Sequence, residues 1–439
     1  MTLKAGGSTR VITCPIGSGI AGQLYKRICE RINDDLEANA FYLSGKGEQV
    51  LLISCDLLCL ERSFVVRVAG AIEAVTGIPR KNIIIGCTHT HEGPYTHALL
   101  FDVPRDDGYL KQLHGWLLEA AVEAVKTARP ARVGCGAGSA HIGYNRRVCW
   151  ADGSHTMYGD TSRADFNGLE GPDDPSHAVV FAVDNNDTII AVAHHNTCHA
   201  TCTESGSFAS ADFPGVARDV IRKSLKKNVP VLYLQGASGD ISPWDLMNRT
   251  PWDGEQRKQE IGRMLAAETL RIMTKTKVTE RTVIRSVQEG IRVAVKIPDA
   301  SAMKKAEKII KLGVEKTGQW DYVLAWSRKK LYERYHKRPV ETLPVHVVRI
   351  GDYAVATNPC ELYCQFGLDI KRRSPAPITA VMQLTNGFSG YCPTICGIRG
   401  GGYSGEPIYW CRLEPYAGYE IVEVSARLLH RLWEKEKTG

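Results

Sequence analysis

The chain has 439 residues, of which 44% are hydrophobic and 23% are charged. This balance is typical of a globular protein and excludes both a disordered chain and a fibrous repeat. The net charge of +7 comes from 55 basic and 48 acidic residues. Because the basic runs lack interleaved aromatic residues, we expect no nucleic-acid partner.

The apolar segments of the chain are short. They fall far below the roughly 18 to 20 residues that cross a bilayer, so we expect no transmembrane helix and no stable membrane anchoring. The N-terminus lacks the apolar stretch of a secretory signal, which predicts a cytoplasmic protein. The 14 cysteines are too sparse for a disulfide scaffold. In a reducing compartment we expect them to be buried thiols or ligands.

The first two-thirds of the chain alternates short β-branched runs with helix-like segments. This pattern predicts an α/β fold with a mixed β-sheet core flanked by helices. We expect strands at 50–55, 82–87, 132–137, 179–183, 188–194 and 231–235, and helices at 62–75, 109–128, 211–225 and 254–276. The two strands within 179–194 should form a hairpin, because turn residues separate them.

The pattern changes after residue 278. Apolar residues alternate over 279–295, and a lysine-rich helical stretch follows over 300–338. Further strands are expected at 345–350, 354–357 and 378–384, and a terminal helix at 417–434. We interpret 1–439 as one domain with a helical insertion at about 297–340.

The strongest local signal for chemistry is the segment CTHTHEGP at 87–94, directly after a predicted strand. In extended backbone, His89 and His91 project to the same side, so one can bind a metal while the other meets a substrate or serves as a second ligand. Glu92 is interpreted as a base or as a cap of the loop.

Two more polar segments follow strands. The segment HHNTCHAT at 194–201 holds three histidines within six residues, which favours a ligand role although a single histidine is more often structural. Asp212, at the start of the next helix, is interpreted as an N-cap or first-turn residue. The loop QGASGDISP at 235–243 contains Ser242, which is a nucleophile, a hydrogen-bond donor or a turn residue.

Cysteine and glycine provide weaker signals. Four cysteine pairs have i, i+4 spacing, namely Cys55/Cys59, Cys198/Cys202, Cys360/Cys364 and Cys392/Cys396. Their spacing is not that of zinc ribbons or ferredoxins. We therefore expect these cysteines to fill tightly packed regions, with a redox role as the alternative. The glycine-rich loop at 397–405 lacks the lysine of a phosphate-binding loop.

Taken together, these motifs resemble the zinc-dependent catalytic domain of the neutral (non-lysosomal) ceramidases. The segment at 10–17 is similar to the first strand and turn of that family, and 88–94 to its His-Thr-His-Ser-Gly-Pro motif, with Glu92 in place of serine. The segments at 199–215, 239–243 and 358–361 resemble its second histidine motif, its Gly-Asp-x-Ser-Pro element and its Pro-Gly-Glu segment. The final elements, SGY at 389–391 and YSG at 403–405, repeat the spacing of two tyrosines in the family's site.

The resemblance implies a role for each matching residue. The zinc ligands would be His89, His199, Glu361 and Tyr391. His91 and Tyr403 would position the scissile amide and stabilise its oxyanion. Arg146 resembles an arginine near that site, and Ser242 resembles a serine whose role as nucleophile or support stays open. Zn²⁺ is therefore the expected cofactor, since it accepts imidazole and carboxylate ligands and activates water at neutral pH.

The leading hypothesis is a zinc-dependent hydrolase that cleaves the carbon–nitrogen amide bond of an N-acyl substrate by metal-activated water. We expect a short form without the family's C-terminal immunoglobulin-like domain, acting on a smaller or more polar substrate than ceramide. The alternatives are an esterase or lactonase on the same zinc site, a noncatalytic binding protein that retains the scaffold, and a thiol redox protein. The expected partner is a small-molecule substrate, and a homo-oligomer is compatible with the sequence.

Overall fold

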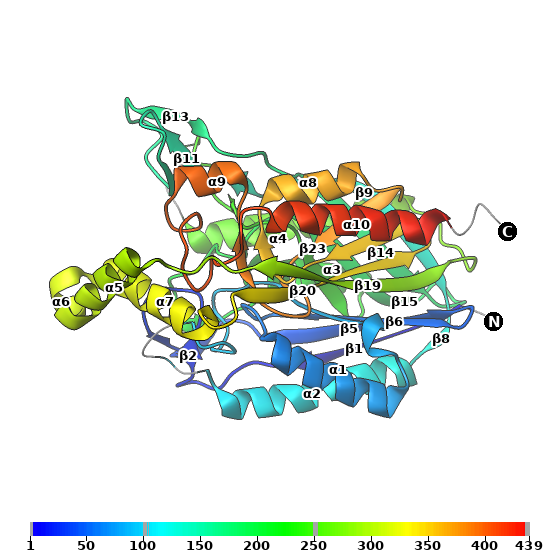
Figure 1. The fold of residues 1–439 in the computed structure, drawn as a ribbon. Helices are drawn as coiled ribbons and strands as arrows, with labels where there is room; N and C mark the ends of the chain where they lie inside the picture. The colour runs from blue at the N-terminus through cyan, green and yellow to red at the C-terminus, as the bar shows by residue number, and fades with distance from the viewer. Residues whose placement is uncertain (1–2, 100–102, 104, 249–252, 435–439) are drawn as a thin grey trace.

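Three β-sheets form the centre of the protein (Figure 1), in a computed structural model that describes residues 3–99, 103, 105–248 and 253–434. The first sheet has the strand order β7-β6-β5-β1-β8. Its strands are β1 (Lys4–Val11), β5 (Glu37–Gly45), β6 (Glu48–Cys55), β7 (Ile83–Cys87) and β8 (Arg129–Pro130). The β6 and β7 strands run parallel, whereas the other neighbours are antiparallel.

The other two large sheets have four strands each. The second sheet, in the order β17-β15-β14-β9, consists of β9 (Arg132–Ser139), β14 (Ser176–Val183), β15 (Ile189–Asn196) and β17 (Val231–Gln235). The third, in the order β19-β20-β21-β23, consists of β19 (Ile284–Ala294), β20 (Val340–Ile350), β21 (Tyr353–Thr357) and β23 (Ile378–Met382). Each contains one parallel pair, β15/β17 or β21/β23, so the core is mixed as predicted.

The three sheets share one apolar core. It is built from side chains of all three, including Phe41 and Leu52 of the first, Val180 and Leu232 of the second, and Val348 and Val355 of the third. Burying each such side chain contributes about 1.5–3 kcal/mol. The central core therefore holds the three sheets together.

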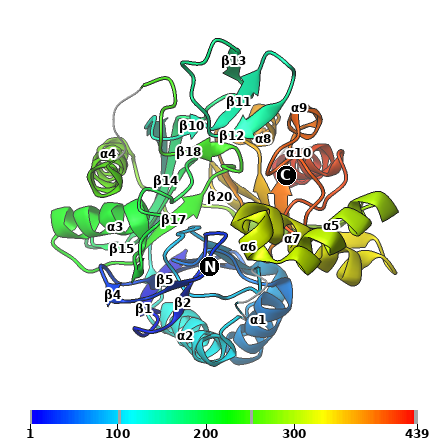
Figure 2. The ribbon, with the colours of Figure 1, turned by 90° about the vertical axis from the view of Figure 1, so that its left-hand side faces the viewer.

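Helices cover the outer faces of the sheets (Figures 1 and 2). The helices α1 (Arg62–Thr76) and α2 (Asp107–Lys126) cover the first sheet, α3 (Asp212–Leu225) and α4 (Gly254–Lys275) the second, and α8 (Cys364–Arg372) and α10 (Ala417–Glu434) the third. This arrangement confirms the predicted α/β class with helices flanking a mixed sheet core.

Local sequence signals account for several helix boundaries. The side chains of Asp106 and Asp253 accept hydrogen bonds from the backbone N–H groups of Tyr109 and Gln256, at 2.8 and 3.0 Å, and so cap α2 and α4. Helix α1 ends where Gly77 adopts φ 72°, a left-handed conformation that glycine reaches without steric cost. The predicted elements at 231–235 and 417–434 match the observed bounds.

Two long strands of the first sheet, β1 and β5, were not predicted from the residue pattern, and the first strand that the resemblance placed at 10–17 overlaps only the end of β1. Strands β1 and β5 carry small and polar residues, KAGGSTRV and EANAFYLSG, rather than a β-branched run. Residues of this kind have low strand propensity. Their pairing with each other over eight residue positions, from Lys4 opposite Ser44 to Val11 opposite Glu37, stabilises them instead.

The lysine-rich stretch forms three helices, α5 (Ala300–Leu312), α6 (Val314–Thr317) and α7 (Gln319–Tyr335), which project from the sheets in Figure 1. Gly313 and Gly318 separate them, with φ values of 81° and 83°. The predicted helical content is therefore present. Its status as an insertion, and the single-domain organisation of 1–439, stay predictions.

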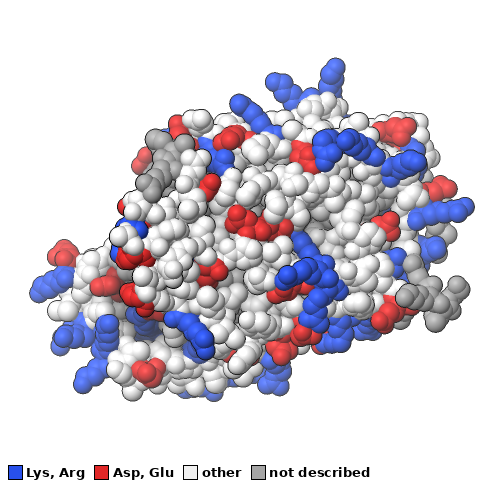
Figure 3. Space-filling view, turned by 90° about the horizontal axis from the view of Figure 1, so that it is seen from above, with Lys and Arg blue, Asp and Glu red and all other residues white. Residues whose placement is uncertain are grey.

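Shorter elements complete the fold. They are β2 (Gly19–Ile20), β3 (Arg27–Ile28), β4 (Arg31–Ile32), η1 (Arg80–Asn82), β10 (Tyr144–Asn145), β11 (Arg147–Trp150), β12 (His155–Met157), β13 (Phe166–Leu169), β16 (Phe208–Ala209), β18 (Ile241–Ser242), β22 (Cys360–Leu362), β24 (Gly390–Cys392) and α9 (Ile395–Gly400). Among the described residues, no helix combines the length and apolar character needed to cross a membrane. Acidic and basic side chains are interspersed on the face drawn in Figure 3.

Candidate metal centre and active site

The predicted site residues follow the ends of five strands. His89 and His91 come after β7, His199 after β15, Ser242 after β17, Glu361 after β21 and Tyr391 after β23. The parallel pairs β6/β7, β15/β17 and β21/β23 bring these strand ends to one end of the core. A crevice at the carboxyl ends of strands is where α/β proteins commonly place ligands.

Two histidines and a glutamate meet at the centre of this end. The Nε2 atoms of His89 and His199 lie 3.0 Å apart. The Oε2 atom of Glu361 lies 3.4 Å from each of these two nitrogens. His91 Nε2 lies 3.4 Å from His89 Nε2. The potential ligand atoms of the three histidines fall within 4.8 Å of one another, a grouping that can hold a metal ion.

Backbone carbonyl groups set the orientation of the two closest rings. His89 Nδ1 lies 2.8 Å from the carbonyl oxygen of Leu58, and His199 Nδ1 lies 2.6 Å from that of Ser238. Since a carbonyl oxygen only accepts hydrogen bonds, each Nδ1 carries a proton and the two Nε2 atoms face each other. Two such nitrogens facing a carboxylate form a site suited to a cation, with the outer hydrogen bonds typical of metal-binding histidines.

The backbone at His89 differs from the predicted extended conformation. His89 has φ 67°, in the left-handed region, and its N–H donates to the carbonyl of Leu57 at 3.0 Å. The prediction that strand alternation aligns His89 with His91 was therefore wrong. The rings still meet, with centroids 4.9 Å apart, because the chain turns sharply after β7.

Burial and neighbouring charges set the protonation of the cluster. Burial, with His89 and His199 nearby, holds the pKa of His91 well below its ordinary value. Burial and Arg146 lower the pKa of His199 to about 3. Burial opposes ionisation of Glu361, but His89 and His199 outweigh it and lower its pKa. These directions favour neutral rings at His91 and His199 and an ionised carboxylate at Glu361, the forms that bind metals.

Arg146 connects the histidine cluster to two tyrosines. Its Nη2 atom lies 3.1 Å from His199 Nε2 and donates to the carbonyl of Gly239 at 3.0 Å and to the hydroxyl of Tyr391 at 3.3 Å. Its Nη1 atom donates to the hydroxyl of Tyr158 at 3.3 Å. The guanidinium is buried, so these contacts fix it beside the cluster.

Tyr391 and Tyr403 face each other across the site, with ring centroids 5.5 Å apart. The side chain of Tyr391 is hydrogen bonded to that of Glu361, and burial and that carboxylate raise the pKa of Tyr391 well above its ordinary value. Burial and Glu361 also raise the pKa of Tyr403. Both hydroxyl groups therefore keep their protons and can donate hydrogen bonds at neutral pH.

The glycine-rich loop positions Tyr403. Arg147, fully buried, donates to the carbonyl groups of Gly397 and Gly401 at 3.1 and 2.9 Å. Gly402 has φ 76°, and a Cβ atom there would lie 2.7 Å from the carbonyl oxygen of His155. The glycines permit this close approach of backbone segments, which explains the loop without a phosphate ligand.

Ser242 is connected to the cluster through other side chains. Strand β18 pairs with β10, which places Ser242 opposite Tyr144. Its Oγ atom accepts a hydrogen bond from the N–H of Trp244 at 3.2 Å and is hydrogen bonded to the side chain of Tyr158, the partner of Arg146. The contacts of Ser242 therefore lead to the cluster through Tyr158 and Arg146.

Glu92, which stands where the resembling family has serine, is buried away from the reacting groups. It accepts a hydrogen bond from the hydroxyl of Thr203 at 2.6 Å. Burial and Asp212 raise its pKa well above the ordinary value. Asp212 is the first residue of α3, as predicted, and its carboxylate accepts from the N–H of Cys202 at 2.9 Å. Both acids hold the loop at 202–206.

That loop carries Glu204, a site residue that the sequence did not indicate. Its Oε2 atom lies 3.5 Å from Nδ1 of His91, with 30% of its side chain exposed. Gln23 donates to the backbone carbonyl of Glu204 at 3.1 Å. A glutamate five residues after a histidine has no motif of its own, so only its position in the structure marks it.

All fourteen cysteines are free thiols, eleven of them buried. Burial raises the pKa of Cys59, Cys87 and Cys360 well above the ordinary value, which leaves little thiolate. Unreactive buried thiols support the packing interpretation over the redox alternative.

Two cavities adjoin the cluster. A small one of about 50 Å³ is lined by His89 and Glu361 together with Leu58, Leu99 and Phe388. A wider one of about 460 Å³ is lined by polar and aromatic groups, among them Arg146, Tyr158, Glu204 and Trp320. His91, Tyr391 and Tyr403 line both cavities.

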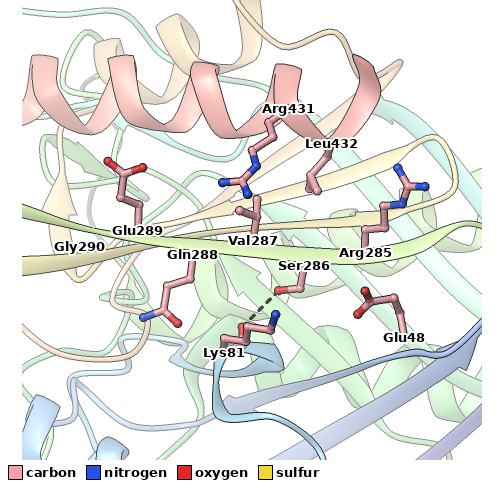
Figure 4. Close-up of a pocket in the computed structure, with 10 residues that line it drawn as sticks. All are labelled: Glu48, Lys81, Arg285, Ser286, Val287, Gln288, Glu289, Gly290, Arg431 and Leu432. Carbon is pink, nitrogen blue, oxygen red and sulfur yellow. Dashed lines mark hydrogen bonds between the residues drawn. The ribbon is translucent and has the colours of Figure 1, made fainter. Parts of the chain in front are cut away.

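A third cavity, of about 530 Å³, lies over β19 (Figure 4). It is lined by Arg285, Arg431 and Lys81 together with Glu48 and Glu289. It contains none of the predicted site residues, so the chemistry belongs to the strand-end site.

No family model and no curated protein matches the sequence. Solved structures do match its fold. The neutral ceramidase from Pseudomonas aeruginosa aligns with a TM-score of 0.75 and 15% identity, over 99% of this chain and 75% of that chain. A ceramidase described as complexed with C2 aligns with a TM-score of 0.74 and 16% identity, over 99% and 76%. The chain therefore has the neutral ceramidase fold.

Proposed function

We propose that this chain is a zinc-dependent hydrolase that cleaves the carbon–nitrogen amide bond of an N-acyl substrate. The observation that carries the proposal is the convergence of His89 Nε2, His199 Nε2 and Glu361 Oε2, with separations of 3.0 to 3.4 Å. This convergence occurs on a fold shared with neutral ceramidase, and that similarity supports amide hydrolysis as the reaction.

The donor set fits zinc. Zn²⁺ takes imidazole nitrogen and carboxylate oxygen in a four-coordinate site. His89, His199, Glu361 and Tyr391 would hold the ion, and the tyrosine hydroxyl adjoins Glu361 through a side-chain hydrogen bond. When bound, zinc supplies Lewis acidity, which activates water and polarises a carbonyl group.

The remaining side chains bind and orient the amide. Tyr403 donates a hydrogen bond to the carbonyl oxygen as negative charge develops there, and His91 holds the amide beside it. Arg146 fixes the hydroxyl of Tyr391 and so keeps the pocket in one geometry. Hydrolysis adds the water oxygen to the carbonyl carbon and breaks the C–N bond. Both protons of the water end on the departing amine, so the products at neutral pH are a carboxylate and an ammonium ion.

The size of the inner cavity supports a substrate smaller than ceramide. The cavity next to His89 and Glu361 has a volume of about 50 Å³. Apolar cavities of about 150 Å³ hold a benzene ring, so this one cannot enclose a long acyl chain.

The test is hydrolysis of matched amide and ester analogues of one acyl group by the full chain, before and after treatment with a chelator. We expect amide cleavage that chelation abolishes and added Zn²⁺ restores. Ester cleavage without amide cleavage would favour the esterase alternative. Turnover that survives complete metal removal would contradict the zinc mechanism.

A further inference from the structure

We infer that the substrate is an amine with a short acyl group, in which the acyl group occupies the small cavity and a polar amine half occupies the wide one. This inference rests on the proposed function and deepens it. It assigns the selection of acyl length to Leu99 and Phe388, and the binding of the amine half to Glu204.

The two cavities meet where the scissile bond would lie. His91, Tyr391 and Tyr403 line both of them, whereas His89 and Glu361 line the small cavity alone. A carbonyl carbon held at this junction has two substituents to place, the acyl chain and the nitrogen. The two cavities therefore receive the two halves of the substrate.

The small cavity suits an apolar group of few atoms. Beyond the cluster most of its walls are apolar, namely Leu24, Leu58, Leu99, Phe388 and Trp410, and Gly22, Gln23 and Tyr95 complete them. Its volume of about 50 Å³ is a third of the roughly 150 Å³ that holds the six carbons of benzene. By this comparison about two carbons fit beyond the carbonyl carbon, so an acyl group of about three carbons in all matches the cavity.

The wide cavity can bind a polar group, because charged and hydroxyl side chains stand among its apolar walls of Met157, Trp320, Leu324 and Ile408. Its walls include Gln23, Thr156 and Tyr158 together with the carboxylates of Glu204 and Glu406. Glu406 forms an ion pair with Arg328, whereas the carboxylate of Glu204 lies next to His91. An alkyl amine released by hydrolysis takes up a proton at neutral pH, so a carboxylate on this side stabilises the ammonium product.

Hydrogen bonds at the residues before and after Glu204 hold its loop in place. Thr203, its neighbour, donates to the buried Glu92, and Arg27 donates to the carbonyl of Gly206 at 2.7 Å. Arg27 also donates to the carbonyl of His91 at 2.5 Å. One buried arginine thus connects the loop of Glu204 to the histidine segment and sets their separation.

The experiment measures kcat/KM for amides of one amine with acyl groups of increasing length. In the wild type we expect the highest values for acyl groups of two to four carbons. A further methylene in a filled apolar pocket costs about tenfold or more, so octanoyl amides should be at least a hundredfold slower. Leu99→Ala and, separately, Phe388→Leu should shift the optimum to longer chains.

Matched controls distinguish an effect of pocket size on the acyl profile from a general folding defect. Leu312→Ala, at an exposed position on α5 outside both cavities, should leave the acyl profile unchanged. Melting temperatures of Leu99→Ala and Leu312→Ala show whether either variant has a folding defect. If Leu99→Ala has one, Phe388→Leu provides the independent test of acyl-length selection. Glu204→Gln should raise KM for substrates with a cationic amine half by about tenfold and leave KM for neutral ones unchanged.

The outcomes distinguish this inference from the proposed function. Amide cleavage with a preference for acyl chains of eight or more carbons would overturn the inference and leave the proposed function intact. An optimum that stays fixed in both Leu99→Ala and Phe388→Leu would also overturn it. Absence of cleavage for every amide by zinc-loaded wild type would overturn both.

Discussion

The Nε2 atoms of His89 and His199 lie 3.0 Å apart although 110 positions separate the two residues in the chain. Each ring donates its other nitrogen to a backbone carbonyl, from Leu58 or Ser238. Two ring nitrogens are therefore held face to face beside the carboxylate of Glu361. Such an arrangement is stable when a cation lies between them.

Loss of either histidine should remove the metal. We expect about one zinc per chain in the wild type and little or none in His89→Ala and His199→Ala, measured by elemental analysis of purified protein. Activity should fall by more than about 100-fold, since loss of a ligand exceeds the 10–100-fold effect of its hydrogen-bond partners. His141→Ala, at a half-exposed histidine paired with Asp173, should retain both metal and activity. Full zinc content in His89→Ala would contradict the predicted ligand set.

Tyr403→Phe should lower kcat with little change in KM. Its hydroxyl is predicted to donate to the oxyanion, and removal of one such donor costs about 10²- to 10³-fold in kcat. Steady-state kinetics at saturating zinc measures the effect. Tyr416→Phe, at an exposed tyrosine, is the matched control. An unchanged kcat in Tyr403→Phe would assign the oxyanion to other donors.

Ser242→Ala should reduce activity about five- to tenfold rather than abolish it. Ser242 contacts Trp244 and Tyr158, and Tyr158 in turn contacts Arg146. Loss of one hydrogen bond costs about 1 kcal/mol, which corresponds to that change in rate. Mass spectrometry of acid-quenched wild type during turnover should reveal no acylated Ser242. An acylated serine would instead make it the nucleophile.

Alkylation of the native protein should leave its activity within about twofold of that of untreated protein. Cys396 is the one exposed cysteine among the fourteen, and eleven are buried. Iodoacetamide should therefore modify Cys396 first, as peptide mapping can show, because buried thiols with raised pKa values provide little thiolate. Activity lost in step with alkylation would favour the thiol redox alternative. Alkylation of Cys396→Ser checks that the first site is correctly assigned.

Stability should depend on pH through Asp174. Burial disfavours its ionised form, but Lys371 and His195 outweigh burial and lower its pKa from 3.8 to about 2. An acid whose pKa falls on folding contributes stability that is complete above the unfolded value of 3.8 and is lost as pH falls toward 2. The shift corresponds to about 2 kcal/mol of unfolding free energy.

Lys371→Met should therefore destabilise the protein by about 2 kcal/mol at pH 7. The difference in unfolding free energy between Lys371→Met and wild type should decrease toward pH 4. The reason is that the unpaired Asp174 carboxyl of the variant takes up a proton at a higher pH than the paired carboxyl of the wild type. Urea unfolding of wild type and variant at pH 7, 5.5 and 4 measures the difference in unfolding free energy and its dependence on pH. Lys329→Met, at an exposed lysine paired with Glu333, should show little change. A difference that stays constant with pH would contradict this account.

The sequence predicted most elements because hydrophobic periodicity reports local burial. Strand β17 and helix α10 match their predicted bounds, since both are continuous segments with a strong apolar pattern. Strands β1 and β5 carry weak signals of their own and depend on their mutual pairing. The backbone turn at His89 was also missed, because a left-handed residue after a strand has no periodic signal.

The site also combines features that the sequence indicated with features that only the structure revealed. The two histidine segments after strands were readable in the sequence as candidate ligands. Glu361, Tyr391 and Tyr403 were predicted only through the resemblance to the neutral ceramidases. The sequence had no signal for Glu204 or for the two cavities that meet at His91. Those features depend on how three sheets pack around one core and bring distant strand ends together. Periodicity reports which side of a segment is buried, whereas only the tertiary structure decides which distant segment it is buried against.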